Sequence, residues 1–212
     1  MAATSKRAGS RPYGVPPSVA MVQGVIAKMK EKTGRTIDEW VKEVKRSGPA
    51  TEQERAQWLK SEHGLGTNYA GWIAGRSVGK GLEDGDPAAY LRAADRHVEE
   101  MYGGAKSALR PIHDELLRVA YSLGSDVKAC PCQTIVPLYR HHVFAQIKPS
   151  TKTRVDLGLA LGDLKKVPAR VIDTGGFEKK DRITHRIAIG ALEEIDDEVK
   201  KWMEVAYEGD RG

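Results

Sequence analysis

Apolar residues in the first third of the chain recur every three or four positions, which is the spacing of one buried face of an α-helix. The first residues that follow this period are Val22, Val25, Ile26 and Met29, and Gly34 ends the run. Two capping boxes come next, Thr36 with Glu39 and Thr51 with Glu54, in which hydroxyl and carboxylate each accept a free backbone N–H. Together with a short helix after Thr67, they predict a compact helical domain.

The second half of the chain combines strand-like runs with helical ones. Helices are expected from Asp86 to about Tyr102, around 109–123, and from about Asp196 onward. Strands are expected at 134–139, 143–147, 155–161, near Val171, and at 183–190. Short connections between the first three strands favour an antiparallel meander. The predicted fold class is α+β: a small N-terminal helical domain followed by an α/β sandwich whose mainly antiparallel sheet is covered by helices on one face.

Domain boundaries follow from two segments that lack apolar periodicity. Residues 1–17 contain three cations, three prolines and no acid, which is typical of a disordered basic leader. Residues 77–86 contain three glycines and three acids and are expected to be a linker. The helical domain is therefore predicted at 18–76 and the α+β domain at 87–210.

The apolar and cysteine content indicates the compartment. No apolar run approaches the roughly 20 residues that a membrane helix needs, and the N-terminus lacks the apolar segment of a secretory signal. The two cysteines, Cys130 and Cys132, are separated by one proline, which is too short a spacing for a disulfide of normal geometry. We therefore expect a cytoplasmic protein without a membrane partner.

The net charge of +5 is unevenly distributed along the chain. Residues 1–80 contain 14 Lys/Arg and 7 Asp/Glu, and residues 140–186 contain 11 and 5. Residues 187–212, in contrast, contain 3 Lys/Arg and 8 Asp/Glu. Two basic blocks of this kind indicate an anionic partner, such as nucleic acid or a nucleotide-like molecule.

Cationic and hydroxyl side chains are concentrated in the connection between two expected strands. They are Lys148, Ser150, Thr151, Lys152 and Arg154. Such a set can hold a phosphate group through charge-assisted hydrogen bonds, and Thr184 and Arg186 on the last strand complete the candidate anion-binding site. The alternative is a solvated hairpin tip whose hydroxyls bond to their own backbone, while Arg186 pairs with Asp156 across the sheet. His185 is expected at the edge of the core, bonded to backbone.

Two groups of side chains offer metal binding as an alternative. The acidic group is Glu193, Glu194 and Asp197, and the softer group is Cys130, Cys132, His141 and His142. The softer group lacks an established zinc spacing. Acids in a first helical turn also favour the positive end of the helix dipole, which is a sufficient structural role. We therefore expect no metal and no other cofactor.

Several segments resemble known families. EKTGRTIDEWVKEVK and WLKSEHGLGTNYAGWI resemble a small helical domain of bacterial proteins that is catalogued only as a domain of unknown function. FAQIKPSTKTRVDLGL, THRIAI and WMEVAY resemble a second such domain, which often follows the first. The resemblance covers residues 19–75 and 103–207 and implies a two-domain architecture, without any catalytic residue. More remotely, the order of elements looks like the YdhG-type fold, which includes a proposed frataxin-like iron chaperone.

These observations favour binding over catalysis. There is no nucleophile elbow and no Gly-rich phosphate loop. We expect a non-enzymatic two-domain protein that binds an anionic ligand, either nucleic acid or a nucleotide-like molecule. The alternatives are metal (iron) handling of the frataxin-like type and a small-molecule-binding domain. No helix presents the row of Arg, Asn and Gln that reads base edges, so sequence-specific recognition is not expected.

Overall fold

The structure is a computed structural model that describes residues 13–212, and it consists of two compact units. The first comprises residues 15–93, and the second comprises 94–212 together with residues 13–14. Residues 1–12, most of the predicted leader, lie outside the described residues. The boundary falls within helix α6 (Pro87–Met101). Each unit is described by itself below.

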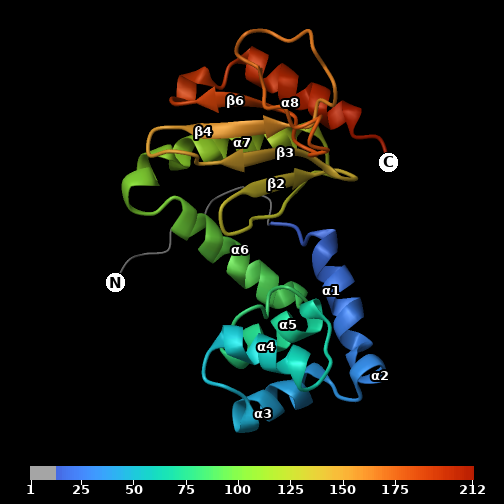
Figure 1. Cartoon of the computed structure of the whole chain (residues 1–212). Coiled ribbons are helices and arrows are strands. Elements are labelled where there is room, and N and C mark those ends of the chain that lie inside the picture. The colour runs from blue at the N-terminus through green and yellow to red at the C-terminus, as the bar shows by residue number, and fades with distance from the viewer. Residues whose placement is uncertain (1–12) are drawn as a thin grey trace. The chain divides into compact units, whose positions relative to one another are not determined.

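Five helices make up most of the first unit (Figure 1). They are α1 (Pro17–Ala27), α2 (Met29–Thr33), α3 (Ile37–Ser47), α4 (Glu52–Ser61) and α5 (Thr67–Ser77). Both predicted capping boxes are present, with Thr36 and Thr51 as the N-cap residues of α3 and α4. Gly34 ends α2 in the left-handed conformation, with φ of 79°, which costs glycine little because it has no Cβ.

The core of this helical unit is built from the apolar stripes that the sequence pattern indicated. Its most buried members are Met29, Val44, Leu59 and Ile73, with Trp40 beside them. The indole N–H of Trp40 donates to Thr33 Oγ1 at 2.8 Å, which satisfies its polar atom inside an apolar environment. The predicted linker at 77–86 is part of this unit, since Arg55 Nη1 donates to Ser77 Oγ at 2.8 Å.

The second unit contains a six-stranded sheet in the order β1-β2-β3-β4-β6-β5, and every neighbouring pair is antiparallel. The strands are β1 (Lys128–Ala129), β2 (Val136–Tyr139), β3 (Val143–Lys148), β4 (Val155–Leu159), β5 (Ile172–Asp173) and β6 (His185–Ile189). The helices are α7 (Arg110–Leu123) and α8 (Asp197–Gly209), with 3-10 turns at Gly104–Leu109 and Leu192–Glu194. The predicted α+β class is confirmed.

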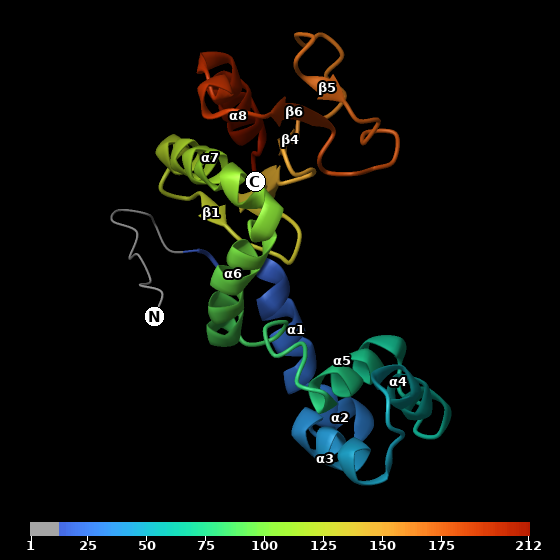
Figure 2. The ribbon, with the colours of Figure 1, turned by 90° about the vertical axis from the view of Figure 1, so that its left-hand side faces the viewer.

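Helices α7 and α8 lie on one side of the sheet, as the turned view shows (Figure 2). The strand register places Ile147, Leu157 and Ile187 side by side, and all three are fully buried. The sequence neighbours of these three residues point to the opposite face, because side chains alternate along a strand. They are Gln146, Gly158 and Arg186, which also pair with one another across the strands. One face of the sheet is therefore the core, and the other face is left open by the helices.

A bulge in β3 changes which side chains reach the open face. Leu138 pairs with Ala145 but Tyr139 pairs with Val143, so Phe144 is an extra residue in the ladder. Phe144 is fully buried and its ring contacts that of Tyr207 on α8, with centroids 5.6 Å apart. Val143 consequently lies on the open face.

No helix among the residues that the structure describes has both the length and the apolar character that crossing a bilayer requires.

Candidate functional site on the open face of the sheet

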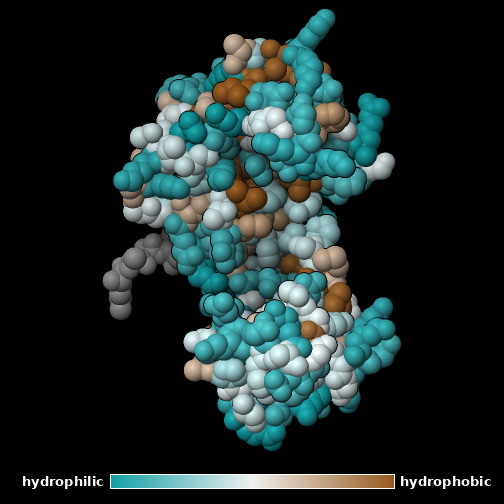
Figure 3. All heavy atoms as spheres, in the orientation of Figure 1, coloured by the Kyte–Doolittle hydropathy of each residue, from teal (hydrophilic) through white to brown (hydrophobic). Residues whose placement is uncertain are grey.

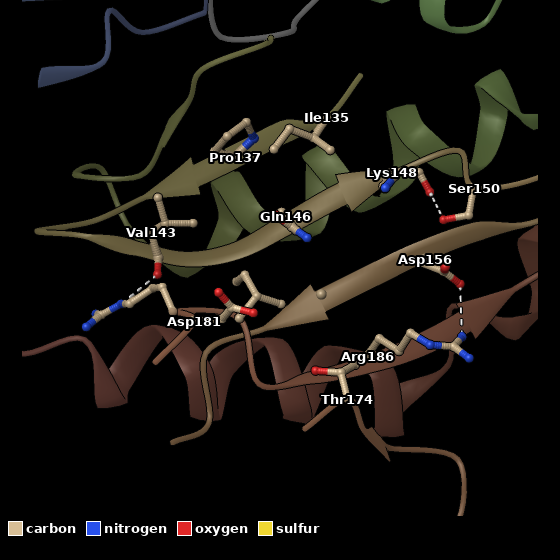
Figure 4. Close-up of a pocket in the computed structure, with 13 residues that line it drawn as sticks. Ile135, Pro137, Val143, Gln146, Lys148, Ser150, Asp156, Thr174, Asp181 and Arg186 are labelled. Carbon is tan, nitrogen blue, oxygen red and sulfur yellow. Dashed lines mark hydrogen bonds and ion pairs between the residues drawn. The ribbon is translucent and has the colours of Figure 1, made fainter. Parts of the chain in front are cut away.

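A hollow of about 510 Å³ lies on the open face of the sheet (Figure 4). Gly158, the fourth of the five residues of β4, is one of its lining residues. A Cβ atom at this position would lie 2.8 Å from both Gln146 Cγ and Ile183 Cγ2, which is closer than carbon atoms approach without displacement. The side chains of Gln146 and Ile183 can therefore approach the strand this closely only because it has no side chain at this point.

The lining divides into an apolar side and polar ends. The apolar lining residues are Ile135, Pro137, Val143 and Ile183. Lys148, Ser150, Asp156 and Arg186 gather at one end of the hollow, as the close-up shows (Figure 4). In the space-filling view, hydrophobic atoms of the sheet unit are exposed among hydrophilic ones (Figure 3). The hollow thus offers both apolar contact and charge.

Three cations surround one carboxylate at the charged end. Asp156 Oδ1 lies 2.9 Å from Arg154 Nε and 3.2 Å from Arg186 Nη1. Lys148 is the cross-strand partner of Asp156 in the register of β3 and β4. Among the described residues, Lys148 has no ion-pair partner of its own. This end of the hollow therefore carries an excess of two positive charges, counted over these four side chains.

The opposite end of the hollow is neutralised by Asp210. This carboxylate is buried and accepts hydrogen bonds from Arg182 and from the backbone N–H groups of His141 and His142. Burial alone raises the pKa of Asp210, but the bonds from His142 and the charge of Arg182 outweigh it, so its pKa lies below the ordinary value. Arg182 also donates to the carbonyl of Val143 at 3.0 Å. These bonds fix the rim without leaving a free cation there.

Gln146 supplies neutral hydrogen-bonding groups in the centre. Its side chain lies over Gly158, and its amide has no hydrogen-bond partner in the part of the chain that the structure describes. An amide of this kind can donate and accept at the same time. The hollow can therefore orient a polar ligand as well as attract its charge.

The structure separates the residues of the predicted anion-binding set. The hollow is lined by three of them, Lys148, Ser150 and Arg186. Arg154 is not a lining residue, but it forms an ion pair with the lining residue Asp156. Thr151 and Lys152 are exposed in the turn, outside the lining. There the hydroxyl of Thr151 accepts the N–H of Thr153 at 3.2 Å.

Thr184 is buried beside His185 rather than exposed in the hollow. Its hydroxyl accepts the N–H of Leu161 at 3.2 Å and lies 2.9 Å from His185 Nδ1. His185 Nε2 lies 2.9 Å from the carbonyl oxygen of Leu164, which can only accept, so the network assigns the proton to Nε2. His185 is thus a buried, backbone-bonded residue at the edge of the core, as expected.

The lining residues that the sequence interpretation omitted include Gln146, Gly158, Asp181 and Arg182. Of these, Gly158 had a usable signal, because an isolated glycine inside a strand pattern indicates a close approach or a ligand. The other three follow only from the strand register and from the path of the loop before β6.

The candidate metal ligands have other contacts. Glu194 accepts the N–H of Gly190 at 2.9 Å, and Asp197 pairs with Lys200 at 3.0 Å, whereas Glu193 is exposed. Cys130 is buried, and the thiol of Cys132 lies 3.8 Å from the carbonyl oxygen of Cys130. Over residues 13–212, no group of three or more His, Cys, Asp or Glu side chains is arranged to hold a metal ion.

Comparison with known proteins identifies two family matches. Residues 98–209 match the family described as Domain of unknown function (DUF5655), and residues 21–76 match Domain of unknown function (DUF4287). The two matches agree with the two-domain resemblance found in the sequence. No curated protein and no solved structure matches the chain.

Proposed function

The chain belongs to the DUF5655 family, and we propose that its sheet unit binds a small phosphate- or carboxylate-bearing molecule of the nucleotide-like kind. The binding site is the hollow over Gly158. The observation that carries the proposal is the excess of positive charge around Asp156, at the end of a hollow whose other two charged lining residues, Asp181 and Arg182, cancel each other in net charge.

The ion pairs at Asp156 leave one arginine available to a ligand. Arg154 lies close enough to neutralise the carboxylate alone, at 2.9 Å. Arg186 can then turn from Asp156 to an incoming anion without leaving a carboxylate unpaired, which is the costly outcome in partly buried sites. Lys148 on the neighbouring strand supplies the second charge. A phosphate or carboxylate group is the chemical match for an Arg and a Lys at one point.

The remainder of the hollow suits the uncharged part of such a ligand. Its volume of about 510 Å³ is within the range typical of small-molecule sites. The amide of Gln146, beside Gly158, can hydrogen-bond to the polar edge of this uncharged part. Because both cysteines are free thiols, we keep a cytoplasmic location as part of the proposal.

Calorimetric titration tests this function. The full chain is titrated with inorganic phosphate, with nucleoside monophosphates and with the matching nucleosides. We expect the phosphate-bearing compounds to bind and Lys148→Gln to weaken them about tenfold, which corresponds to roughly 1.4 kcal/mol for one lost charge-assisted contact. Lys152→Gln is the matched control, because this lysine belongs to the same turn but lies outside the hollow. Absence of binding, or equal loss in both variants, contradicts the proposal.

A further inference from the structure

A second charged depression, of about 420 Å³, lies on the helical unit. Its lining residues are Lys30, Gly34, Arg35, Glu39, Lys42, Glu43 and Arg46. These residues come from α2, from the tight turn that follows it, and from α3, which adjoin in both ribbon views (Figures 1 and 2). We call this surface the α2–α3 groove.

The α3 residues of the groove form one stripe along the helix. Glu39, Lys42, Glu43 and Arg46 recur at steps of three, one and three positions, so they share one face. The buried residues of α3, which include Trp40 and Val44, lie on the opposite face. The stripe is therefore the solvent-facing side of a helix whose other side is fixed in the core.

Both carboxylates of the groove are already engaged. Glu39 accepts the backbone N–H of Thr36 at 2.7 Å as part of the capping box. Glu43 accepts Arg35 at 3.0 Å and Arg46 at 2.7 Å. These carboxylates hold the helix start and the two guanidinium groups in place, and they leave an excess of two positive charges in the groove.

The two lysines of the groove carry that excess. Lys30 and Lys42 are exposed, and neither forms an ion pair with another described residue. Lys42 and Arg46 are one helical turn apart, about 6 Å along the axis. The groove therefore presents two cations one turn apart on α3, with Lys30 and Arg35 in the same lining.

We propose that the α2–α3 groove binds the phosphate backbone of nucleic acid, independently of base sequence. Backbone binding is almost entirely electrostatic, and the described lining of the groove consists of charged side chains and one glycine. An acidic peptide is a poorer match, because protein interfaces depend on buried aromatic or apolar residues that this lining lacks. The lining also lacks Asn and Gln, so it has no group of the type that reads adenine.

This site is separate from the proposed function in both residues and ligand. The hollow of the sheet unit combines apolar and charged lining residues, whereas the described lining of the groove consists of charged side chains and one glycine. Lys148→Gln is therefore expected to leave nucleic-acid binding unchanged, and variants in the groove are expected to leave the binding of nucleoside monophosphates unchanged. Failure of one proposal can thus be told from failure of the other.

The experiment is a salt titration of the full chain against a fluorescently labelled DNA duplex, followed by anisotropy. We expect Lys30→Gln/Lys42→Gln to reduce the slope of log K against log salt by about 1.8, or roughly 0.9 for each lost phosphate contact. Lys45→Gln/Lys60→Gln is the matched control: both lysines are exposed in the same unit, outside the groove, and the change in net charge is identical. The control is expected to keep the original slope.

Conservative variants guard against a folding artefact. Lys30→Arg/Lys42→Arg retains the charges and is expected to retain the slope. The proposal is overturned if the duplex does not bind at low salt, or if the groove variant keeps the original slope. It is also overturned if the control lowers the slope equally, or if two unrelated duplex sequences bind with clearly different affinities.

Discussion

Replacement of Asp156 by asparagine is expected to change stability and ligand affinity in opposite directions. The substitution keeps the shape of the side chain but removes the charge that Arg154 and Arg186 share. Both arginine side chains are about one third exposed, at 39% and 30%, so each pair contributes only about 0.2–1 kcal/mol. We therefore expect Asp156→Asn to lower the free energy of unfolding by about 0.4–2 kcal/mol.

The same change should strengthen anion binding. It raises the excess positive charge at this end of the hollow from two to three. Removing a negative charge about 5 Å from a bound monoanion is worth roughly 0.8 kcal/mol at the dielectric constant of water, and more where the site excludes water. At low ionic strength this corresponds to about fourfold tighter binding of inorganic phosphate.

Urea unfolding and calorimetry on the same protein preparations measure the two effects. Glu204→Gln is the matched control, because Glu204 is exposed on α8 and the change in net charge is the same. We expect this control to alter the phosphate affinity less than about twofold and the stability by less than about 0.5 kcal/mol. Weaker phosphate binding by Asp156→Asn, or a gain equalled by the control, would refute the electrostatic reasoning.

Three further outcomes test other parts of the structure. Because the folded-state pKa of Asp210 is lowered, its stabilising effect is present above the unfolded pKa of about 4 and disappears as the pH falls through the folded pKa. The stability difference between the native chain and Asp210→Asn, measured by thermal unfolding, should therefore be large at pH 7 and shrink below pH 4; a pH-independent difference would contradict this. Thr51→Ala removes an N-cap and should cost about 1 kcal/mol in urea unfolding of the full chain, and an unchanged midpoint would argue against the capping box. Burial raises the pKa of both thiols, that of Cys130 to about 12, but only Cys132 is exposed to solvent. An alkylating reagent followed by mass spectrometry should therefore label Cys132 first in the folded protein, and equally rapid labelling of both would contradict the burial of Cys130.

Local signals in the sequence were sufficient for most of the architecture. The capping boxes at Thr36 and Thr51 mark real helix starts, since capping is decided by residues within one turn. The strands after residue 134 follow from β-branched runs and short connections. The two-residue strand β1 (Lys128–Ala129) was not predicted, because a segment this short has no periodicity of its own.

Local sequence patterns also did not predict the boundary between the two units. Glycines at 79, 81 and 85 mark a turn, but whether a turn links two domains or closes one depends on its tertiary contacts. Here the segment belongs to the helical unit, and the boundary lies within the regular helix α6. Where one helix belongs to both units, the three-to-four-residue spacing of its apolar residues continues without a break, so the sequence does not mark the boundary.

Sequence composition also could not tell which residues of the donor-rich stretch belong to the candidate site. Lys148 and Lys152 belong to one donor-rich stretch and are equivalent in composition, yet only Lys148 lines the hollow. The difference comes from the register that pairs Gln146 with Gly158 and places Arg186 beside them. Pairing of strands that are distant in the chain cannot be derived from composition, and neither can the bulge at Phe144, which places Val143 on the open face.

Chemical-shift mapping by NMR on the isotopically labelled full chain tests the central claim most directly. Inorganic phosphate and a nucleoside monophosphate are the ligands, and Lys148→Gln is the comparison protein. We predict saturable shifts of the backbone amides of Gln146, Lys148, Gly158 and Arg186, strongly reduced in the variant. Shifts that do not saturate, or that are confined to the exposed turn around Lys152 and to the helical unit, would contradict a binding site on the open face of the sheet.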